Sequence, residues 1–225
     1  MTHMEESWSR RRTRVREVFL ETAGTVVGLL AEPAVAAAWE KPSALRDFSV
    51  QGLAGHTVWP ELALPDLLAR PVPEEPVVSL REYYLERVTW LDAGVDGAVS
   101  VRIRRGGEAT AADGHEALVG RAREAVERLR TELHGTPAVR PVRMPSWGDW
   151  SLDLDDFLLT RLMELVVHAD DLAYSVGLPA PDFPETVTAP VVDLLARLAV
   201  RRHGPLQVIR GLARAERAPG SIAGI

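Results

Sequence analysis

The sequence predicts an all-α protein, a bundle of long helices with one small β-hairpin. Two observations lead to this fold class. Apolar residues recur at intervals of three and four over several long segments, which is the period of a helix buried on one face. Glycine and proline punctuate the ends of these segments, where helices stop. We expect one helical domain over residues 1–178 and a short helical C-terminal extension over residues 179–225.

The first two helices are predicted near the N-terminus. Residues 6–31 form a long amphipathic helix, with helically spaced positions at Val15, Val18, Phe19, Thr22, Val26 and Leu29. Ser49 is a favourable N-cap for a second helix that runs through Val58. Pro60 and Pro65 are expected to kink or interrupt that helix, because proline lacks the backbone N–H that a helix needs.

The next part of the chain is less regular. Residues 71–76 are rich in proline and predict a connection, and residues 79–91 predict a further helix. Over residues 94–110, apolar and polar residues alternate as in a strand, but the stretch is short and bounded by glycines. The sequence therefore favours no structure there.

The second half of the chain is strongly patterned. A third amphipathic helix is predicted over residues 115–133, and Gly135 follows it. Residues 139–144 and 150–152 flank the turn-forming segment PSWGD, which predicts a hairpin. Aspartates then favour the start of a fourth long helix, which Gly177 ends. The C-terminal extension is predicted to hold one helix ending at Gly204 and a short helix after it, their start signals being Pro190 and Pro205.

Composition and charge exclude several classes of function. The formal net charge is −6, which argues against general nucleic-acid binding, and the basic residues 10–16 are interpreted as a solvated helix start. No stretch approaches the roughly 18 apolar residues of a membrane span. The first residues lack the pattern of a secretory signal, so we expect a cytoplasmic protein. The absence of cysteine excludes disulfides, thiolate metal sites and a cysteine nucleophile.

Three residues are candidate metal ligands. Glu164 and His168 lie four residues apart, so a helix places them on one face, and His56 lies on the predicted second helix. Two histidines and a carboxylate from two helices can hold a metal ion and leave a position open for chemistry. The same spacing is also typical of the solvated face of an amphipathic helix, and periodicity alone favours this second interpretation for Arg161, Glu164, His168, Asp171 and Ser175.

The sequence resembles the DinB superfamily, and most closely its branch of mycothiol-dependent maleylpyruvate isomerase-like proteins. The resemblance rests on residues 42–62 (PSALRDFSVQGLAGHTVWPEL), residues 147–179, which contain ELVVHADDLA, and residues 203–222 (HGPLQVIRGLARAERAPGSI). It implies a four-helix bundle that binds a divalent metal, usually zinc, through a histidine on the second helix and an E-x-x-x-H pair on the fourth. In this chain those ligands are His56, Glu164 and His168.

The resemblance also implies a function. The bound metal would activate a low-molecular-weight thiol such as mycothiol, for S-transfer to a small electrophile or for thiol-assisted isomerisation of it. Asp170 or Asp171 could orient His168 or bind substrate. The family's isomerases use an arginine in a C-terminal domain, and no motif identifies it among Arg201, Arg202 and Arg210. The protein is expected to be a monomer or a homodimer.

Other interpretations of the same residues stay open at this point. The ligand set also fits a metal-dependent hydrolase or a non-haem iron enzyme. A non-catalytic helical module that binds a metal or a ligand belongs to a different class. The aromatic residues either line a pocket or, as is more common, belong to the core; they are Trp59, Tyr83, Tyr84, Trp90, Trp147 and Trp150.

Overall fold

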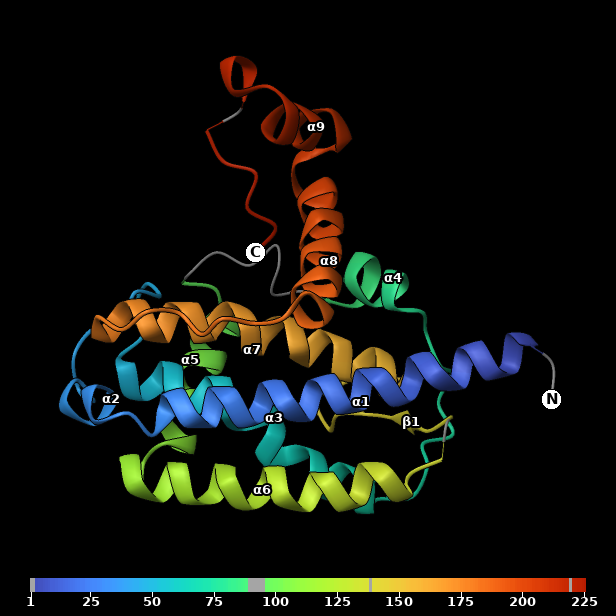
Figure 1. Ribbon diagram of the computed structural model, residues 1–225, viewed down its shortest axis with the longest axis horizontal. Helices are drawn as coiled ribbons and strands as arrows, with labels where there is room; N and C mark the ends of the chain where they lie inside the picture. Colours follow the sequence, from blue (N-terminus) through green and yellow to red (C-terminus); the bar gives the residue numbers. More distant parts are fainter. Residues whose placement is uncertain (1–2, 89–95, 138, 219) are drawn as a thin grey trace.

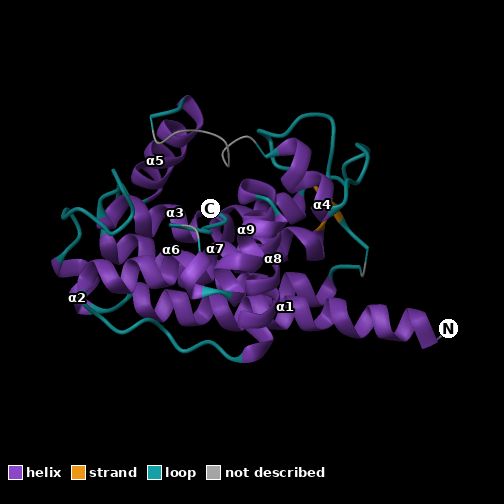
Figure 2. Ribbon diagram, turned by 90° about the horizontal axis from the view of Figure 1, so that it is seen from above, coloured by secondary structure: helices purple, strands orange, loops and turns teal. Residues whose placement is uncertain are grey.

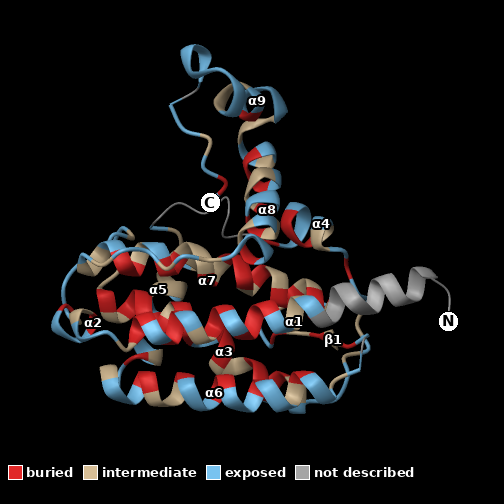
Figure 3. Ribbon diagram, viewed as in Figure 1, coloured by how far each residue is buried: buried red, intermediate tan, exposed pale blue. Residues whose placement is uncertain are grey.

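Four long helices lie side by side in the computed structural model, which describes residues 3–88, 96–137, 139–218 and 220–225 (Figure 1). They are α1 (His3–Leu30), α3 (Val50–Ala69), α6 (His115–Gly135) and α7 (Leu154–Val176). Helix α1 packs against α6 and α7, and α3 packs against the same two helices. Buried residues gather where these helices face one another (Figure 3). The predicted all-α class is confirmed.

Helix α1 follows the predicted pattern but corrects one interpretation. Its core face buries Phe19 and Leu30 completely or nearly so. Arg16 belongs to the basic segment that the sequence assigned to solvent, yet its side chain is only 11% exposed and its Nε donates to Asp155 Oδ1 at 2.9 Å. Its Nη atoms donate to the backbone carbonyls of residues 133, 136 and 137. Arg16 therefore ties α1 to the end of α6 and to the start of α7. A short helix, α2 (Pro33–Ala37), follows.

Helix α3 begins as predicted and continues further than predicted. Ser49 Oγ accepts a hydrogen bond from the backbone N–H of Gly52 at 3.0 Å and caps the helix. Pro60 and Pro65 lie inside the helix, so of the two predicted outcomes, a kink or an interruption, the interruption does not occur. Both prolines are buried, and apolar side chains are buried on either side of them. This burial outweighs the two backbone hydrogen bonds that the prolines remove.

The predicted helix over residues 79–91 is shorter and partly of another type. Ser79 caps α4 (Leu80–Glu82), and the chain continues as a π-helical turn, η1 (Tyr83–Arg87). It ends at Val88, whose backbone is extended. The remainder of the prediction lies among residues 89–95, outside the described residues. The π-helical turn buries Tyr83 and Tyr84.

Residues with strand-like alternation form helix α5 (Ala98–Thr110) instead. Figure 2 shows α5 beside the bundle, and its main partner is α3. The two helices approach closely through glycines. A Cβ at Gly55 would overlap the carbonyl oxygen of Gly107, and a Cβ at Gly107 would overlap that of Gly52. The same imagined Cβ at Gly107 would lie 3.1 Å from the Cβ of His56, so α5 fixes the backbone of a candidate ligand.

The hairpin and the fourth long helix agree with the prediction. Strands β1 (Pro141–Val142) and β2 (Leu152–Asp153) pair in an antiparallel manner, with Pro141 opposite Asp153. Asp153 also caps α7 by accepting from the N–H of Asp155 at 3.1 Å. Gly177, with a φ of 72°, ends α7 in the left-handed conformation that glycine adopts most readily.

The C-terminal extension is helical, as predicted. It contains α8 (Glu185–His203), α9 (Pro205–Ala213) and a single 3₁₀ turn, η3 (Ala215–Arg217). Helix α8 starts against α7 and leads away from the bundle, and α9 lies at its far end (Figure 1). The division after residue 178 stays a prediction. None of the described helices is long and apolar enough to cross a membrane.

Candidate metal centre

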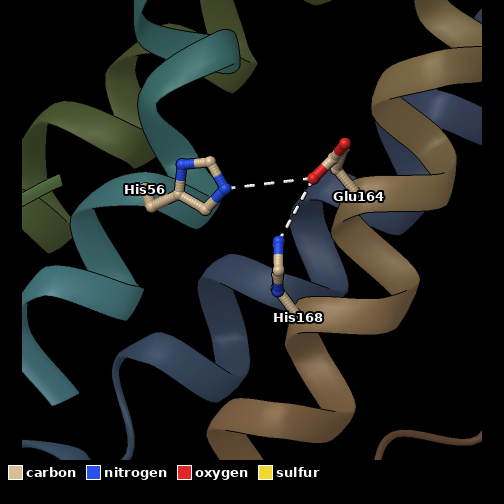
Figure 4. A group of neighbouring side chains, drawn as sticks. All are labelled: His56, Glu164 and His168. Carbon is tan, nitrogen blue, oxygen red and sulfur yellow. Dashed lines mark hydrogen bonds and ion pairs between the residues drawn. The ribbon is translucent and has the colours of Figure 1, made fainter. Parts of the chain in front are cut away.

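The three predicted ligands meet between α3 and α7. His56 comes from the second turn of α3, and Glu164 and His168 come from adjacent turns of α7 (Figure 4). Glu164 Oε2 lies 3.1 Å from His168 Nε2 and 3.9 Å from His56 Nε2. One potential ligand atom from each residue lies within 4.8 Å of the others. The two imidazole rings meet nearly edge to face, with centroids 4.9 Å apart.

The polar stripe of α7 is not a solvated face. The side chains of Arg161, Glu164 and His168 are 15%, 13% and 9% exposed, because α3 packs against this face. Asp171 and Ser175 are half-buried. The interpretation that these residues form the solvated face of an amphipathic helix, which periodicity alone favoured, is therefore wrong. A carboxylate and a histidine buried at this depth need compensating partners.

His168 lies between two carboxylates, one on each side of its ring. Its Nδ1 is 3.0 Å from Asp171 Oδ2, and its Nε2 is 3.1 Å from Glu164 Oε2. Burial would lower the pKa of His168, but the hydrogen bonds to Asp171 and Glu164 outweigh it and raise the pKa to about 9. In the metal-free protein at pH 7, both ring nitrogens of His168 therefore carry protons and donate them to carboxylate oxygens.

The other two residues already have the charge states that a metal ion requires. Burial and the neighbouring charge of His168 lower the pKa of His56 to about 4, so its ring is neutral at pH 7. Burial would raise the pKa of Glu164, but the hydrogen bond from His168 and the charge of Arg161 lower it to about 2. Glu164 is therefore ionised across the physiological range.

This donor set fits a zinc ion. Zinc binds imidazole nitrogens and carboxylate oxygens, and catalytic zinc sites often have three protein ligands. A ligating histidine usually donates its second N–H to a carboxylate, which is the role that Asp171 can fill for His168. Within the described part of the chain, no second group of three or more such side chains meets the same distance criterion.

The remaining residues that the sequence singled out are distributed around this group. Asp171 contacts His168, whereas Asp170 is exposed. Arg201 and Arg202 lie in the last turn of α8, and Arg210 lies on α9, in the part of the chain that leads away from the bundle (Figure 1).

Most of the aromatic residues form one cluster beside the hairpin. Tyr83, Tyr84 and Trp150 are buried, and Trp147 stacks on Trp150 with ring centroids 4.1 Å apart. Trp59 is 40% exposed, and Trp90 lies outside the described residues.

Sequence reasoning missed two residues near the ligands. Glu61 follows His56 on α3 and is only 1% exposed, and neither of its carboxyl oxygens has a hydrogen-bond partner among the described residues. The sequence placed Arg161 only among the residues of a solvated helix face. In the structure, its Nη2 lies 3.9 Å from Oε1 of the candidate ligand Glu164. A lone glutamate within the apolar stretch from Val58 to Leu64 was the available signal for Glu61.

Comparisons with known proteins agree with this architecture. Two solved structures resemble the chain: the mycothiol-dependent maleylpyruvate isomerase (TM-score 0.51) and a histidine-to-alanine mutant of it (TM-score 0.52). In each case the identity is 18%, and the match covers 88% of this chain and 72% of the other. No curated protein sequence matches. The fold is thus the DinB-like bundle that the sequence predicted.

A family model identifies the chain more directly. The family described as the mycothiol maleylpyruvate isomerase N-terminal domain matches residues 19–173, which contain all of α3 and α6, most of α7, the second part of α1 and all three candidate ligands. This match covers more than half of the chain. The chain therefore belongs to the family of mycothiol maleylpyruvate isomerase N-terminal domains.

Proposed function

We propose that this protein is a zinc-dependent enzyme that uses mycothiol, or a similar small thiol, to isomerise a small electrophile or to transfer the thiol to it. The observation that carries the proposal is the convergence of His56, Glu164 and His168 from two helices. Family membership supports the thiol, because the family is named for a mycothiol-dependent isomerisation. Maleylpyruvate is the first electrophile to test.

Different residues of the chain would bind the metal ion and position its ligands. His56, Glu164 and His168 would hold the ion, and Asp171 would keep the His168 ring in position. When bound by three protein ligands, zinc keeps a position open for a thiol and lowers the thiol pKa, so that thiolate is available near pH 7. His56 and Asp171 are the most exposed members of the group, with side chains 24% and 28% exposed. The thiol would therefore approach from their side.

The first test is elemental analysis of the purified protein. Wild-type protein should hold about one zinc per chain, and His56→Ala and His168→Ala should lose it. His134→Ala is the matched control, because His134 is an exposed histidine on another helix, α6. Wild-type protein that retains no stoichiometric metal, and takes up none when zinc is added, would contradict the proposal and favour a non-catalytic helical module.

The second test follows the thiol. Zinc-loaded protein is incubated with mycothiol and maleylpyruvate, and both products and free thiol are measured. Isomerisation leaves the thiol concentration unchanged, whereas S-transfer consumes one thiol for each product molecule formed. Retained zinc with neither reaction would favour a hydrolytic or structural metal. A thiol-dependent reaction also fits the reducing cytoplasm.

A further inference from the structure

A second polar cluster adjoins the candidate ligands. Arg161 of α7, Glu61 of α3 and Tyr84 of η1 contribute to it, because the charges of Arg161 and of the candidate ligand Glu164 act on both Glu61 and Tyr84. Arg161 lies one turn before Glu164 on α7, and its charge interacts with Glu61, Tyr84 and Tyr83. We call Arg161, Glu61 and Tyr84 the Arg161 cluster.

The guanidinium of Arg161 is held in place but has unused hydrogen-bonding capacity. Its Nε donates to Thr160 Oγ1 at 3.0 Å, and its Cζ lies 5.5 Å from the centroid of the Phe157 ring. Its Nη2 lies 3.9 Å from Glu164 Oε1, which is beyond hydrogen-bond distance. Neither Nη atom forms a hydrogen bond with another described residue. The paired N–H groups of an arginine match the two oxygens of a carboxylate.

Glu61 is a buried acid without a partner in the described structure. Both carboxyl oxygens are inaccessible to water and have no hydrogen-bond partner there, which is rare for a buried polar group. Burial raises the pKa of Glu61 to about 8, so the carboxyl carries a proton at pH 7 and can donate it in a hydrogen bond. A neutral Glu61 also adds no second negative charge beside Arg161, whose charge Glu164 already shares.

Tyr84 adds a third unused group. It is 4% exposed, and its hydroxyl likewise has no hydrogen-bond partner among the described residues. Its ring packs against Tyr83, with centroids 4.8 Å apart, and Tyr83 in turn contacts Trp147 and Trp150. Aromatic rings thus lie beside the Arg161 cluster and lower the local polarity, which strengthens charge-assisted hydrogen bonds.

We propose that Arg161, Glu61 and Tyr84 form a subsite that binds a carboxylate group of the substrate beside the His56–Glu164–His168 group. The proposal rests on the proposed function and deepens it, because it names the residues that would bind and orient a carboxylate of the electrophile. Arg161 supplies the charge and paired donors, and Glu61 and Tyr84 supply further O–H donors. The reacting part of the molecule would then lie toward the metal ligands.

The test measures binding of succinate by isothermal titration calorimetry. A carboxylate can also bind directly to a metal ion, so the titration is performed with zinc-free His56→Ala protein as well as with zinc-loaded wild-type protein. Succinamide, which has the same shape without charge, is the ligand control. Succinate should bind both proteins, and Arg161→Met should weaken that binding at least tenfold in each background, an effect of roughly 1.4 kcal/mol.

Two further variants separate recognition from folding. Arg161→Lys keeps the charge without the paired donors and should weaken binding, and Glu61→Gln keeps a donor and should largely preserve it. Arg102→Met, at an exposed position on α5, is the matched control and should bind as wild type does. If Arg161→Met does not fold, as judged by circular dichroism, Arg161→Lys decides the question alone.

The outcomes separate this proposal from the proposed function. Absence of succinate binding to the His56→Ala protein, or equal binding by the arginine variants, would refute the subsite even if the wild type binds zinc and uses mycothiol. Arg161-dependent succinate binding, together with a wild-type protein that takes up no zinc, would support the subsite and refute the zinc-dependent function. In the active enzyme, Arg161→Lys should raise KM for a carboxylate substrate more than it lowers kcat.

Discussion

Zinc binding should release one proton, and the affinity for zinc should therefore depend on pH in a defined window. In the metal-free protein, the hydrogen bonds to Asp171 and Glu164 raise the pKa of His168 to about 9. The ring must lose its Nε2 proton to bind a metal ion. His56 is already neutral at pH 7 and Glu164 is already ionised, so neither contributes a second proton.

The loss of zinc affinity at pH 7 follows from the difference between pH 7 and the pKa of His168. Each pH unit below the pKa costs about 1.36 kcal/mol, so competition with the proton lowers the apparent zinc affinity at pH 7 by about 2.7 kcal/mol, or about 100-fold, relative to its plateau. The affinity should rise about tenfold per pH unit from pH 6.5 until it levels near pH 9. Zinc affinity rises with pH because the pKa of His168 in the folded protein lies above that of a free histidine, so the ring keeps its proton over most of this pH window.

The assay combines two measurements. Zinc affinity is measured at pH 6.5, 7.5 and 8.5 by competition with a chromophoric chelator whose own protonation is corrected for. Proton release is measured by calorimetry at pH 7 in two buffers with different heats of ionisation, and about one proton per zinc is expected. His134→Ala should behave as wild type does. An affinity that is constant from pH 6.5 to 8.5, with no proton released, would refute the charge state assigned to His168 or its role as a ligand.

Two further predictions concern the scaffold. Gly107→Ala places a Cβ in overlap with the carbonyl oxygen of Gly52 and 3.1 Å from the Cβ of His56, so α3 and α5 must move apart. It should lower both the zinc affinity and the free energy of unfolding, the latter by about 1–3 kcal/mol. The neighbouring Gly106→Ala meets nothing within 4 Å and should be neutral or slightly stabilising. Urea unfolding checks this, and equal effects of the two substitutions would contradict it. Arg16→Met removes a largely buried ion pair and three hydrogen bonds to backbone carbonyls, and should lower the free energy of unfolding by about 3 kcal/mol. Arg14→Met, at an exposed position nearby, should change it by less than about 0.5 kcal/mol, and a comparable loss there would count against the role assigned to Arg16.

The local sequence pattern predicted the helices that form because of their own periodicity and end signals. Helices α6 and α7 have strong amphipathic periodicity and clear end signals, and both form where expected. Helix α5 could not be predicted, because the β-branched residues in its alternating stretch and its two adjacent glycines are poor helix formers. Its close packing on α3 through Gly55 and Gly107 involves residues far apart in the sequence. The uninterrupted course of α3 through Pro60 is likewise a consequence of burial, which no single segment reveals.

The candidate site likewise combines features that local sequence predicts with features that depend on packing. Spacing alone places Glu164 and His168 on one face of a helix, but it cannot distinguish a ligand pair from a solvated stripe, because the difference lies in what packs opposite. Here α3 packs opposite, and it brings His56 to within 3.9 Å of Glu164. The resemblance to a family named that histidine, whereas no motif named Glu61, whose significance depends on its burial and on its missing hydrogen-bond partners.

The charges on this face suggest why the polar stripe is retained. Without a metal ion, Glu164 is balanced by protonated His168 and by Arg161, so the face is already close to electrical balance. Binding a divalent ion and losing one proton from His168 adds positive charge to a largely buried group. The net gain favours an anion in the same place, and a thiolate or a carboxylate would supply it. In the proposed mechanism, the proton on His168 would therefore balance the charge of Glu164 in the metal-free protein, and its release on metal binding would favour an anionic reactant.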